Sequence, residues 1–257
     1  MNEIDKLADI INEHEQDFIQ DGSLERPFVD SRHTLEQAIE AIKQNKPECP
    51  PEILENLSLV TVEYLGFDDK FHEGQILVHQ DLQTDIQDFF KLAISLKFPI
   101  EVIKPISEFN DDDEASMSKN NSSGFNFRKI AGKNKISLHG FGFAIDINPR
   151  MNPFMEYVTD DSGNRELVAT QPQNGEYNVE ANGTLSEGHP LVEFLKERGW
   201  IWGGDWEDYK DFQHFEKSLA TEEYLANLQL NLENGEITPE QFEQLSLRAH
   251  GNSQKML

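Results

Sequence analysis

The stretch ISLHGFGFAIDINP, residues 136–149, carries the most informative pattern in the sequence. Gly140 and Gly142 argue against a helix here, because glycine is unfavourable in helix interiors. From Phe143 onward, apolar and polar residues alternate as they do in a strand with one buried face. Asp146 is therefore expected on the face opposite the core, where its carboxylate is available to a site.

A second stretch, WGGDWEDYKDFQHFE at residues 202–216, places another histidine near a carboxylate. Asp211 and His214 are three residues apart, so one turn or a bulged strand entry can present both to one point. His139 precedes Asp146 by seven residues, and a loop can fold this histidine back over the end of the strand. Two imidazoles and one carboxylate, with no fourth protein ligand, would make an open tetrahedral zinc site.

The other carboxylate of the second stretch, Asp211, suits the role of general base and acid. Zinc lowers the pKa of bound water toward neutrality, and a carboxylate beside it can take and deliver the proton. The spacing alone is equally compatible with two buried, hydrogen-bonded histidines. Zinc is inferred from the ligand types, and manganese or cobalt could replace it in vitro.

The composition narrows the possible functions of the chain. The 257 residues include 48 acidic and 22 basic side chains, which gives a formal charge of −26. Such a surface repels phosphate backbones, so nucleic acid is excluded as a partner. The single cysteine offers no thiolate cluster, and any metal site must use histidine and carboxylate ligands.

No apolar run is long enough to span a membrane, and acids appear from position 3 of the N-terminus. Because no Sec-type signal is visible, we expect a cytoplasmic protein, unless it leaves the cell by lysis or by a dedicated route.

Three zones are expected along the chain. Residues 1–57 are predicted to form a helical N-terminal extension, in which Thr34 and Gln37 make a capping box at the start of one helix. Residues 58–217 mix strand and helix patterns. Residues 218–257 are predicted to form a C-terminal helical hairpin.

Within the middle zone, residues 58–64 and 75–78 are predicted to form a strand pair. Asp81 is predicted to cap a helix. Residues 98–106 are predicted to be the next strand, and the polar stretch 107–124 a solvated loop. The expected buried stripe of the helix comprises Leu82, Ile86, Phe89, Phe90, Ala93 and Ile94.

The polar stretch from Thr159 to Gly188 is too long for an idle connector in a compact domain. Its length is typical of a lid, a binding loop or a disordered insertion. A short helix over residues 191–198, ended by Gly199, is predicted to follow it.

Three ordered motifs give the sequence a resemblance to a known family. They are S-x-H-x-x-G-x-A-x-D within residues 124–154, then W-G-G-x-W and D-x-x-H-F within residues 194–217. Together they resemble the M15 zinc peptidases, the group of D-alanyl-D-alanine carboxypeptidases and L-alanyl-D-glutamate endopeptidases. The resemblance extends from near Val60 to near Lys217.

The resemblance implies an α+β fold, a compact zinc peptidase domain of the D-Ala-D-Ala carboxypeptidase/hedgehog-like type with an antiparallel sheet. It implies that His139, Asp146 and His214 bind Zn²⁺ and that Asp211 is the catalytic carboxylate. The N-terminal extension and the C-terminal hairpin fall outside it and inherit no role.

Three further residues acquire expected roles from the resemblance. Arg128 best matches the arginine that stabilises charge on the attacked carbonyl, although Lys129, Lys133 and Lys135 lie close by. Ser137 matches a serine expected to hydrogen-bond to a ligand or to substrate. Trp206 is either a wall of the substrate site or a core aromatic residue.

The expected function is hydrolysis of an amide bond in a peptidoglycan stem peptide or muropeptide. Two alternatives stay open: a non-catalytic zinc-containing binding or structural domain on the same fold, and a peptidase with a substrate outside the cell wall. The sequence leaves open the scissile bond, exo- against endopeptidase specificity and the oligomeric state.

Overall fold

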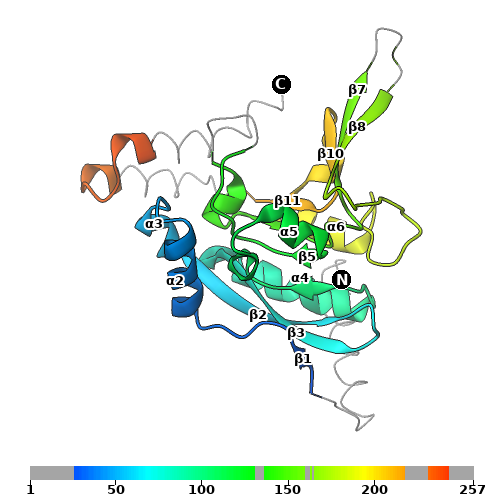
Figure 1. The fold of residues 1–257 in the computed structure, drawn as a ribbon, viewed down its shortest axis with the longest axis horizontal. Helices are drawn as coiled ribbons and strands as arrows, with labels where there is room; N and C mark the ends of the chain where they lie inside the picture. Colours follow the sequence, from blue (N-terminus) through cyan, green and yellow to red (C-terminus); the bar gives the residue numbers. More distant parts are fainter. Residues whose placement is uncertain (1–25, 131–135, 160–162, 164, 218–230, 243–257) are drawn as a thin grey trace.

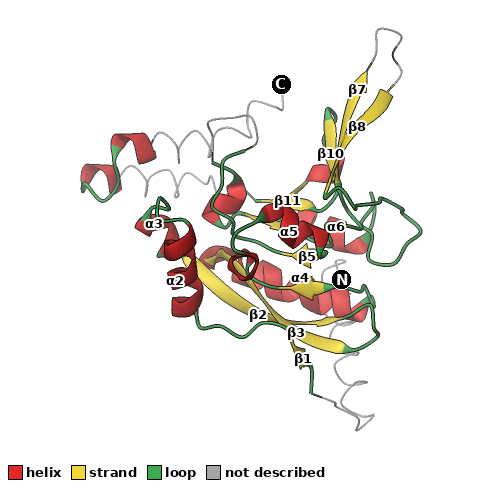
Figure 2. Ribbon diagram, in the orientation of Figure 1, coloured by secondary structure: helices red, strands yellow, loops and turns green. Residues whose placement is uncertain are grey.

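The computed structural model describes residues 26–130, 136–159, 163, 165–217 and 231–242 (Figures 1 and 2). Helices are combined with short, mostly antiparallel sheets, as in the α+β class. The closer assignment to a hedgehog-like fold stays a prediction. Within the described parts of the chain, none of the helices is long and apolar enough to cross a membrane.

The first sheet has the strand order β1-β3-β2. Strands β2 (Leu57–Leu65) and β3 (Phe71–His79) are antiparallel and confirm the predicted strand pair. Strand β1 (Phe28–Val29) adds a parallel edge to β3.

Helix α4 (Gln83–Ser95) packs against β2. The predicted stripe is buried except for Ile94, which is half-buried, while Leu92 is fully buried. The predicted cap at Asp81 is wrong, because residue 81 belongs to a 3₁₀ turn, η1 (Gln80–Leu82), that precedes the helix. Instead, the imidazole of His79 accepts the backbone N–H of Asp81 at 3.3 Å.

The second sheet carries the candidate site and has the order β6-β11-β9. Its strands are β6 (Ala144–Asp146), β11 (His214–Glu216) and β9 (Ile201–Trp202), all antiparallel. Ile145 and Phe215 are fully buried in the main core, with the side chains of α4 and of α6 (Pro190–Glu197). Helix α6 confirms the predicted helix before Gly199, whose φ of 81° is left-handed.

The third sheet extends away from the body of the molecule (Figure 1). It has the order β10-β7-β8, with antiparallel strands β7 (Phe154–Thr159), β8 (Arg165–Gln171) and β10 (Tyr209–Asp211). The stretch from Thr159 to Gly188 is therefore not one loop, because its first part returns along the sheet as β8. A function for it as a lid or binding loop stays a prediction.

The predicted strand over residues 98–106 is largely wrong. Only β4 (Val102–Ile103) pairs, in parallel with β5 (Asn121–Ser122), and a 3₁₀ helix, η2 (Ile106–Phe109), follows. The solvated loop predicted for residues 107–124 is also wrong. It contains α5 (Asp113–Ser118), and residues 120–123 are buried.

Side-chain amides explain how such a polar stretch can be buried. The Asn121 Oδ1 accepts the backbone N–H of Lys104 at 2.9 Å. Its Nδ2 donates to the Lys104 carbonyl at 3.0 Å and to the Ser116 hydroxyl at 2.9 Å. Asn121 thereby satisfies backbone groups that a longer strand would otherwise pair.

Residues 1–25 of the predicted N-terminal extension lie outside the described residues, and its described part is helical only in part. Residues 26–34 form β1 and irregular backbone, whereas α2 (Leu35–Asn45) begins with the predicted reciprocal capping box of Thr34 and Gln37. A short helix, α3 (Pro51–Leu54), precedes β2. A second apolar cluster joins these helices to the sheet; it includes Ala38, Ile42, Leu54, Leu57, Leu77, Phe125 and Phe127.

The C-terminal helical hairpin lies mostly outside the described residues and stays a prediction, as does the division into three zones. In the described part, the Thr238 hydroxyl accepts the N–H of Gln241 at 3.1 Å, and the Gln241 side chain accepts that of Thr238 at 2.6 Å.

We predict that Asn121→Ala lowers the free energy of unfolding by at least about 2 kcal/mol, because each buried group left without a partner costs about 1–3 kcal/mol. Urea denaturation measures this change. Lys119→Ala, at an exposed neighbouring position, should stay within about 0.5 kcal/mol of the unchanged protein. Equal stability of the two variants would contradict a structural role for the Asn121 amide.

Candidate metal centre

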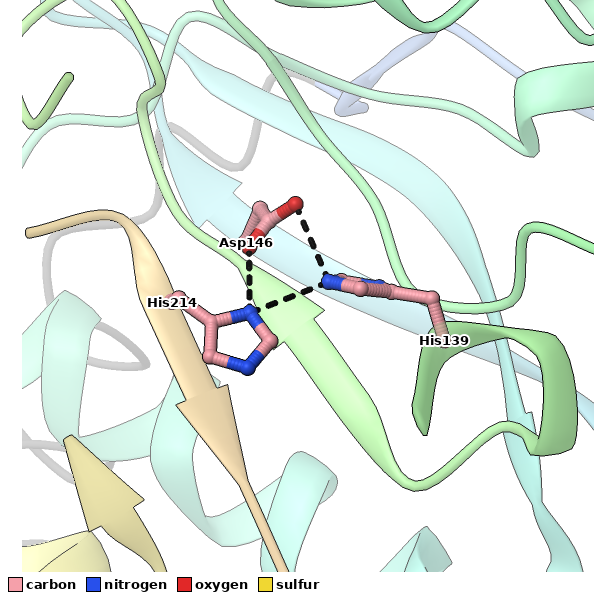
Figure 3. Close-up of side chains that lie close together, drawn as sticks. All are labelled: His139, Asp146 and His214. Carbon is pink, nitrogen blue, oxygen red and sulfur yellow. Dashed lines mark hydrogen bonds and ion pairs between the residues drawn. The ribbon is translucent and has the colours of Figure 1, made fainter. Parts of the chain in front are cut away.

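Three buried side chains from three elements converge on one point (Figure 3). His139 lies in the 3₁₀ helix η3 (Leu138–Phe141), Asp146 ends β6 and His214 begins β11. The register of the second sheet sets His214 directly opposite Asp146. The structure thus brings together the three predicted ligands.

The turn that carries His139 differs from the prediction, since Gly140 lies inside a short 3₁₀ helix. Gly142 ends this helix in the left-handed region, with φ of 74°, where glycine is favoured. The Ser137 hydroxyl caps its start by accepting the N–H of His139 at 3.4 Å. The two glycines therefore shorten the helix rather than prevent it.

The candidate ligand atoms lie within 4.8 Å of one another. His139 Nε2 is 3.1 Å from His214 Nδ1 and 3.2 Å from Asp146 Oδ2. His214 Nδ1 is 3.2 Å from Asp146 Oδ1. The side chains of all three residues are at most 8% exposed, so bulk water does not dilute their interactions.

The outer nitrogen of each imidazole already has an acceptor. His139 Nδ1 donates to the Gly124 carbonyl at 2.7 Å, and His214 Nε2 donates to Glu216 Oε2 at 3.2 Å. In neutral rings the remaining nitrogens, His139 Nε2 and His214 Nδ1, would turn their lone pairs toward each other at 3.1 Å, so either a proton or a metal cation must lie between them. Two imidazole nitrogens and a carboxylate, each imidazole oriented from behind, fit an open zinc site.

The charges of the metal-free centre are strongly coupled. Burial opposes ionisation of Asp146, but the charges and hydrogen bonds of His139 and His214 hold its pKa well below the usual range. Burial likewise opposes the charged form of His214, but hydrogen bonds to Asp146 and Glu216 outweigh it and raise the pKa to about 10. Without a metal, His214 therefore holds a proton that a cation must displace.

Asp211, at the end of β10, lies close enough to the three candidate ligands for their charges to act on its carboxylate. A two-residue turn separates it from His214, as the spacing predicted. Its Oδ1 is buried, and no described residue hydrogen-bonds to that atom. Burial raises the pKa of Asp211 to about 6; the His214 charge opposes this shift and the Asp146 charge adds to it.

The two glycines of the W-G-G motif lie in close contact with other parts of the site: Gly203 with Asp211, and Gly204 with the ring of Trp202. A Cβ added to Gly203 would lie 2.5 Å from the Asp211 carbonyl oxygen and 2.9 Å from the Asp211 Cβ. A Cβ on Gly204 would lie 2.3 Å from the ring of Trp202. The motif therefore allows a close backbone approach that sequence reasoning did not assign to it.

The structure places the Arg128 guanidinium against Asp113, and no hydrogen bond or ion pair between described residues joins it to the three candidate ligands. Its Nε lies 3.0 Å from Asp113 Oδ2, while its carbonyl accepts the N–H of Ser137 at 2.9 Å. Of the nearby lysines, Lys129 is exposed, and the other two lie outside the described residues. A catalytic role for Arg128 stays a prediction.

Trp206 lies close to the centre and is half-buried, with its ring centroid 5.3 Å from that of His214. It also packs edge-on against Tyr209. This position suits a wall of the site, and a contact with substrate stays a prediction, as it does for Ser137.

Sequence reasoning missed Gly124 and Glu216 as partners of the two histidines. The Glu216 partnership has a sequence signal, because residues two apart on a strand share a face. The Gly124 carbonyl has none, because its contact with residue 139 depends on the fold.

Comparison with known proteins agrees with this geometry. Residues 131–217 match a family model described as D-alanyl-D-alanine carboxypeptidase. The match supports an M15 family peptidase. The matched segment includes the three candidate ligands and Asp211, whereas Arg128 precedes it. No curated protein and no solved structure matches the chain significantly.

We predict that zinc raises the melting temperature of the protein and that a chelator reverses this effect. Free zinc at a hundredfold excess over Kd stabilises a protein by about 2.7 kcal/mol, or roughly 5–10 °C at this size. His214→Ala should abolish the shift, and His33→Ala, at a histidine outside the centre, should retain it. A shift retained in His214→Ala would exclude this centre as the zinc site.

We also predict that zinc affinity rises with pH, by up to about tenfold per unit between pH 6 and 8, because binding displaces the His214 proton. The raised pKa of His214 stabilises the metal-free fold below its unfolded value of about 6.5, and this contribution is lost as the pH rises toward 10. Calorimetry in buffers of different ionisation enthalpy should detect about one proton released at pH 7. A binding heat that does not depend on the buffer would contradict this prediction.

Proposed function

We propose that the protein is a zinc-dependent peptidase that hydrolyses an amide bond in peptidoglycan stem peptides. The observation that carries the proposal is the convergence of His139, Asp146 and His214 beside the buried carboxylate of Asp211. The family match supports a peptidase in general. We infer the cell-wall substrate from the description of that family as D-alanyl-D-alanine carboxypeptidase.

His139 Nε2, His214 Nδ1 and an Asp146 oxygen would hold the metal. A zinc ion there supplies Lewis-acid activation of water and of the substrate carbonyl. Asp211 takes the proton of the attacking water at its carboxylate and delivers it to the leaving amine. Burial of Asp211 raises its pKa above the usual range in the metal-free centre, and a carboxyl group that titrates closer to the working pH can both accept and donate a proton.

Arg128 is the proposed stabiliser of negative charge on the attacked carbonyl. Its Nε is engaged by Asp113, but a guanidinium has five N–H donors in a planar fork. Asp113 also accepts the side-chain N–H of Asn126 at 3.0 Å, so it ties Arg128 to the segment that follows Gly124. This tether would limit the freedom of the arginine before substrate binds.

Charge near the centre bears on which bond is cut. A carboxypeptidase must hold a terminal carboxylate, whereas an endopeptidase need not. Glu207 and Asp208 are exposed close to the site in sequence, while the nearby Asp205 is paired with Lys196 at 2.9 Å. Carboxypeptidase activity would therefore depend on Arg128 or a lysine to offset the local negative charge.

Digestion of purified muropeptides by zinc-loaded protein, with and without chelator and followed by mass spectrometry, tests the proposal. Chelator-sensitive loss of a terminal D-alanine would identify a carboxypeptidase, and cleavage between L-Ala and D-Glu an endopeptidase. Tight zinc binding without a product from any stem peptide would overturn the proposal and favour a non-catalytic domain or a substrate outside the wall.

We predict that Asp211→Asn lowers kcat by about 10²–10⁴-fold, because the proton acceptor is lost. Zinc content, measured by metal analysis, should not change, since Asp211 is not one of the three ligands. Asp208→Asn, which removes an exposed acid three residues away, is the matched control and should keep kcat within about twofold. Full activity of Asp211→Asn would exclude the proposed proton transfer.

A further inference from the structure

We infer that Glu216 is a positioning residue that holds His214 with Nδ1 toward the metal. The inference rests on the metal site of the proposed function, although it concerns affinity for the ion rather than hydrolysis. It adds Glu216 to the three ligands and the base, and it assigns a role to the side chain that follows the D-x-x-H-F motif.

The strand geometry places the two side chains together. His214 and Glu216 are two residues apart on β11, so both lie on the face opposite Phe215, which is buried in the core. The register sets Glu216 opposite Ala144, whose small side chain leaves room on that face. The resulting distance from His214 Nε2 to Glu216 Oε2 is 3.2 Å.

The contact selects one form of the imidazole ring. A neutral histidine carries its proton on one nitrogen, and an acceptor at Nε2 keeps the proton there and leaves the Nδ1 lone pair free. Without this acceptor, the ring can rotate, or the proton can move to Nδ1, and either change removes the lone pair from the centre. The Glu216 side chain is only 15% exposed, so water competes poorly for the bond.

The two histidines are held by different kinds of acceptor. His139 donates to a neutral carbonyl, that of Gly124, whereas His214 donates to a carboxylate. A carboxylate behind the ring increases the basicity of the coordinating nitrogen and strengthens its bond to a cation. Glu216 also brings a third largely buried carboxylate near the centre, beside Asp146 and Asp211, and a divalent cation offsets this concentration of negative charge.

Metal affinity measured with Zn²⁺ or Co²⁺ alone tests the inference without any substrate. We expect Glu216→Ala to bind zinc about 10–100-fold more weakly in competition with a chromophoric chelator. Glu216→Gln keeps an oxygen that can accept the Nε2–H, so it should recover most of the affinity. Glu207→Ala removes an exposed carboxylate and should bind zinc within twofold of the unchanged protein.

The visible spectrum of the Co²⁺ complex provides a second readout, since it reports the geometry of the ligands. We expect an altered spectrum for Glu216→Ala and an unaltered one for Glu216→Gln. If Glu216→Ala does not fold, Glu216→Gln and Glu216→Asp still test the inference, because the shorter aspartate withdraws the acceptor and should weaken binding.

The inference is overturned if Glu216→Ala, or Glu216→Asp where the alanine variant does not fold, binds zinc within twofold of the unchanged protein. It is also overturned if Glu207→Ala loses as much affinity for zinc, because that would indicate a general effect of charge. Either result leaves the peptidase proposal intact if the unchanged protein cleaves muropeptides. Conversely, weakened binding in Glu216→Ala together with no cleavage by the unchanged protein would support the positioning role and overturn the peptidase proposal.

Discussion

The pairing of His214 with Asp146 across two short strands is the constraint on which the site depends. A shift of one residue in this register would turn one of the two side chains into the core and bring Phe215 or Ile145 to the face that carries the candidate site. The apolar side chains on the other face prevent that shift, since Phe215 and Ile145 are fully buried against α4 and α6. The hydrophobic core thus fixes the spacing of the polar centre.

Features governed by neighbouring residues could be predicted from the sequence. The β2–β3 pair, the buried stripe of α4 and the capping box at Thr34 follow from local periodicity and from spacing of a few residues. The four principal residues of the site could also be identified, because histidines and carboxylates occur at spacings that suit metal binding and proton transfer. The ordered motifs then favoured a metal site over buried, hydrogen-bonded histidines.

Features that depend on distant partners could not be predicted in the same way. The stretch around Asn121 has the composition of a loop, yet it is buried. The Asn121 side-chain amide pairs with the backbone of Lys104, which lies 17 residues earlier in the chain. Asp81 does not cap α4, because the end of β3 leads into the 3₁₀ turn η1, which His79 caps, and α4 continues from that turn without a side-chain cap of its own. The close approach of Gly203 to Asp211 likewise exists only once β10 and the segment before it are packed together.

Asp211 and the pair of Asp146 and His214 belong to different sheets. Asp211 pairs with Phe154 in the projecting sheet of β7, β8 and β10, whereas His214 belongs to the core sheet, and only Phe212 and Gln213 join them. The ring of Phe212 stacks on that of Tyr177, with centroids 3.6 Å apart, and the Phe212 carbonyl accepts the indole N–H of Trp202. The projecting hairpin can therefore change in length or sequence, and with it the surroundings of Asp211, without disturbing the strand pair that holds His214 opposite Asp146.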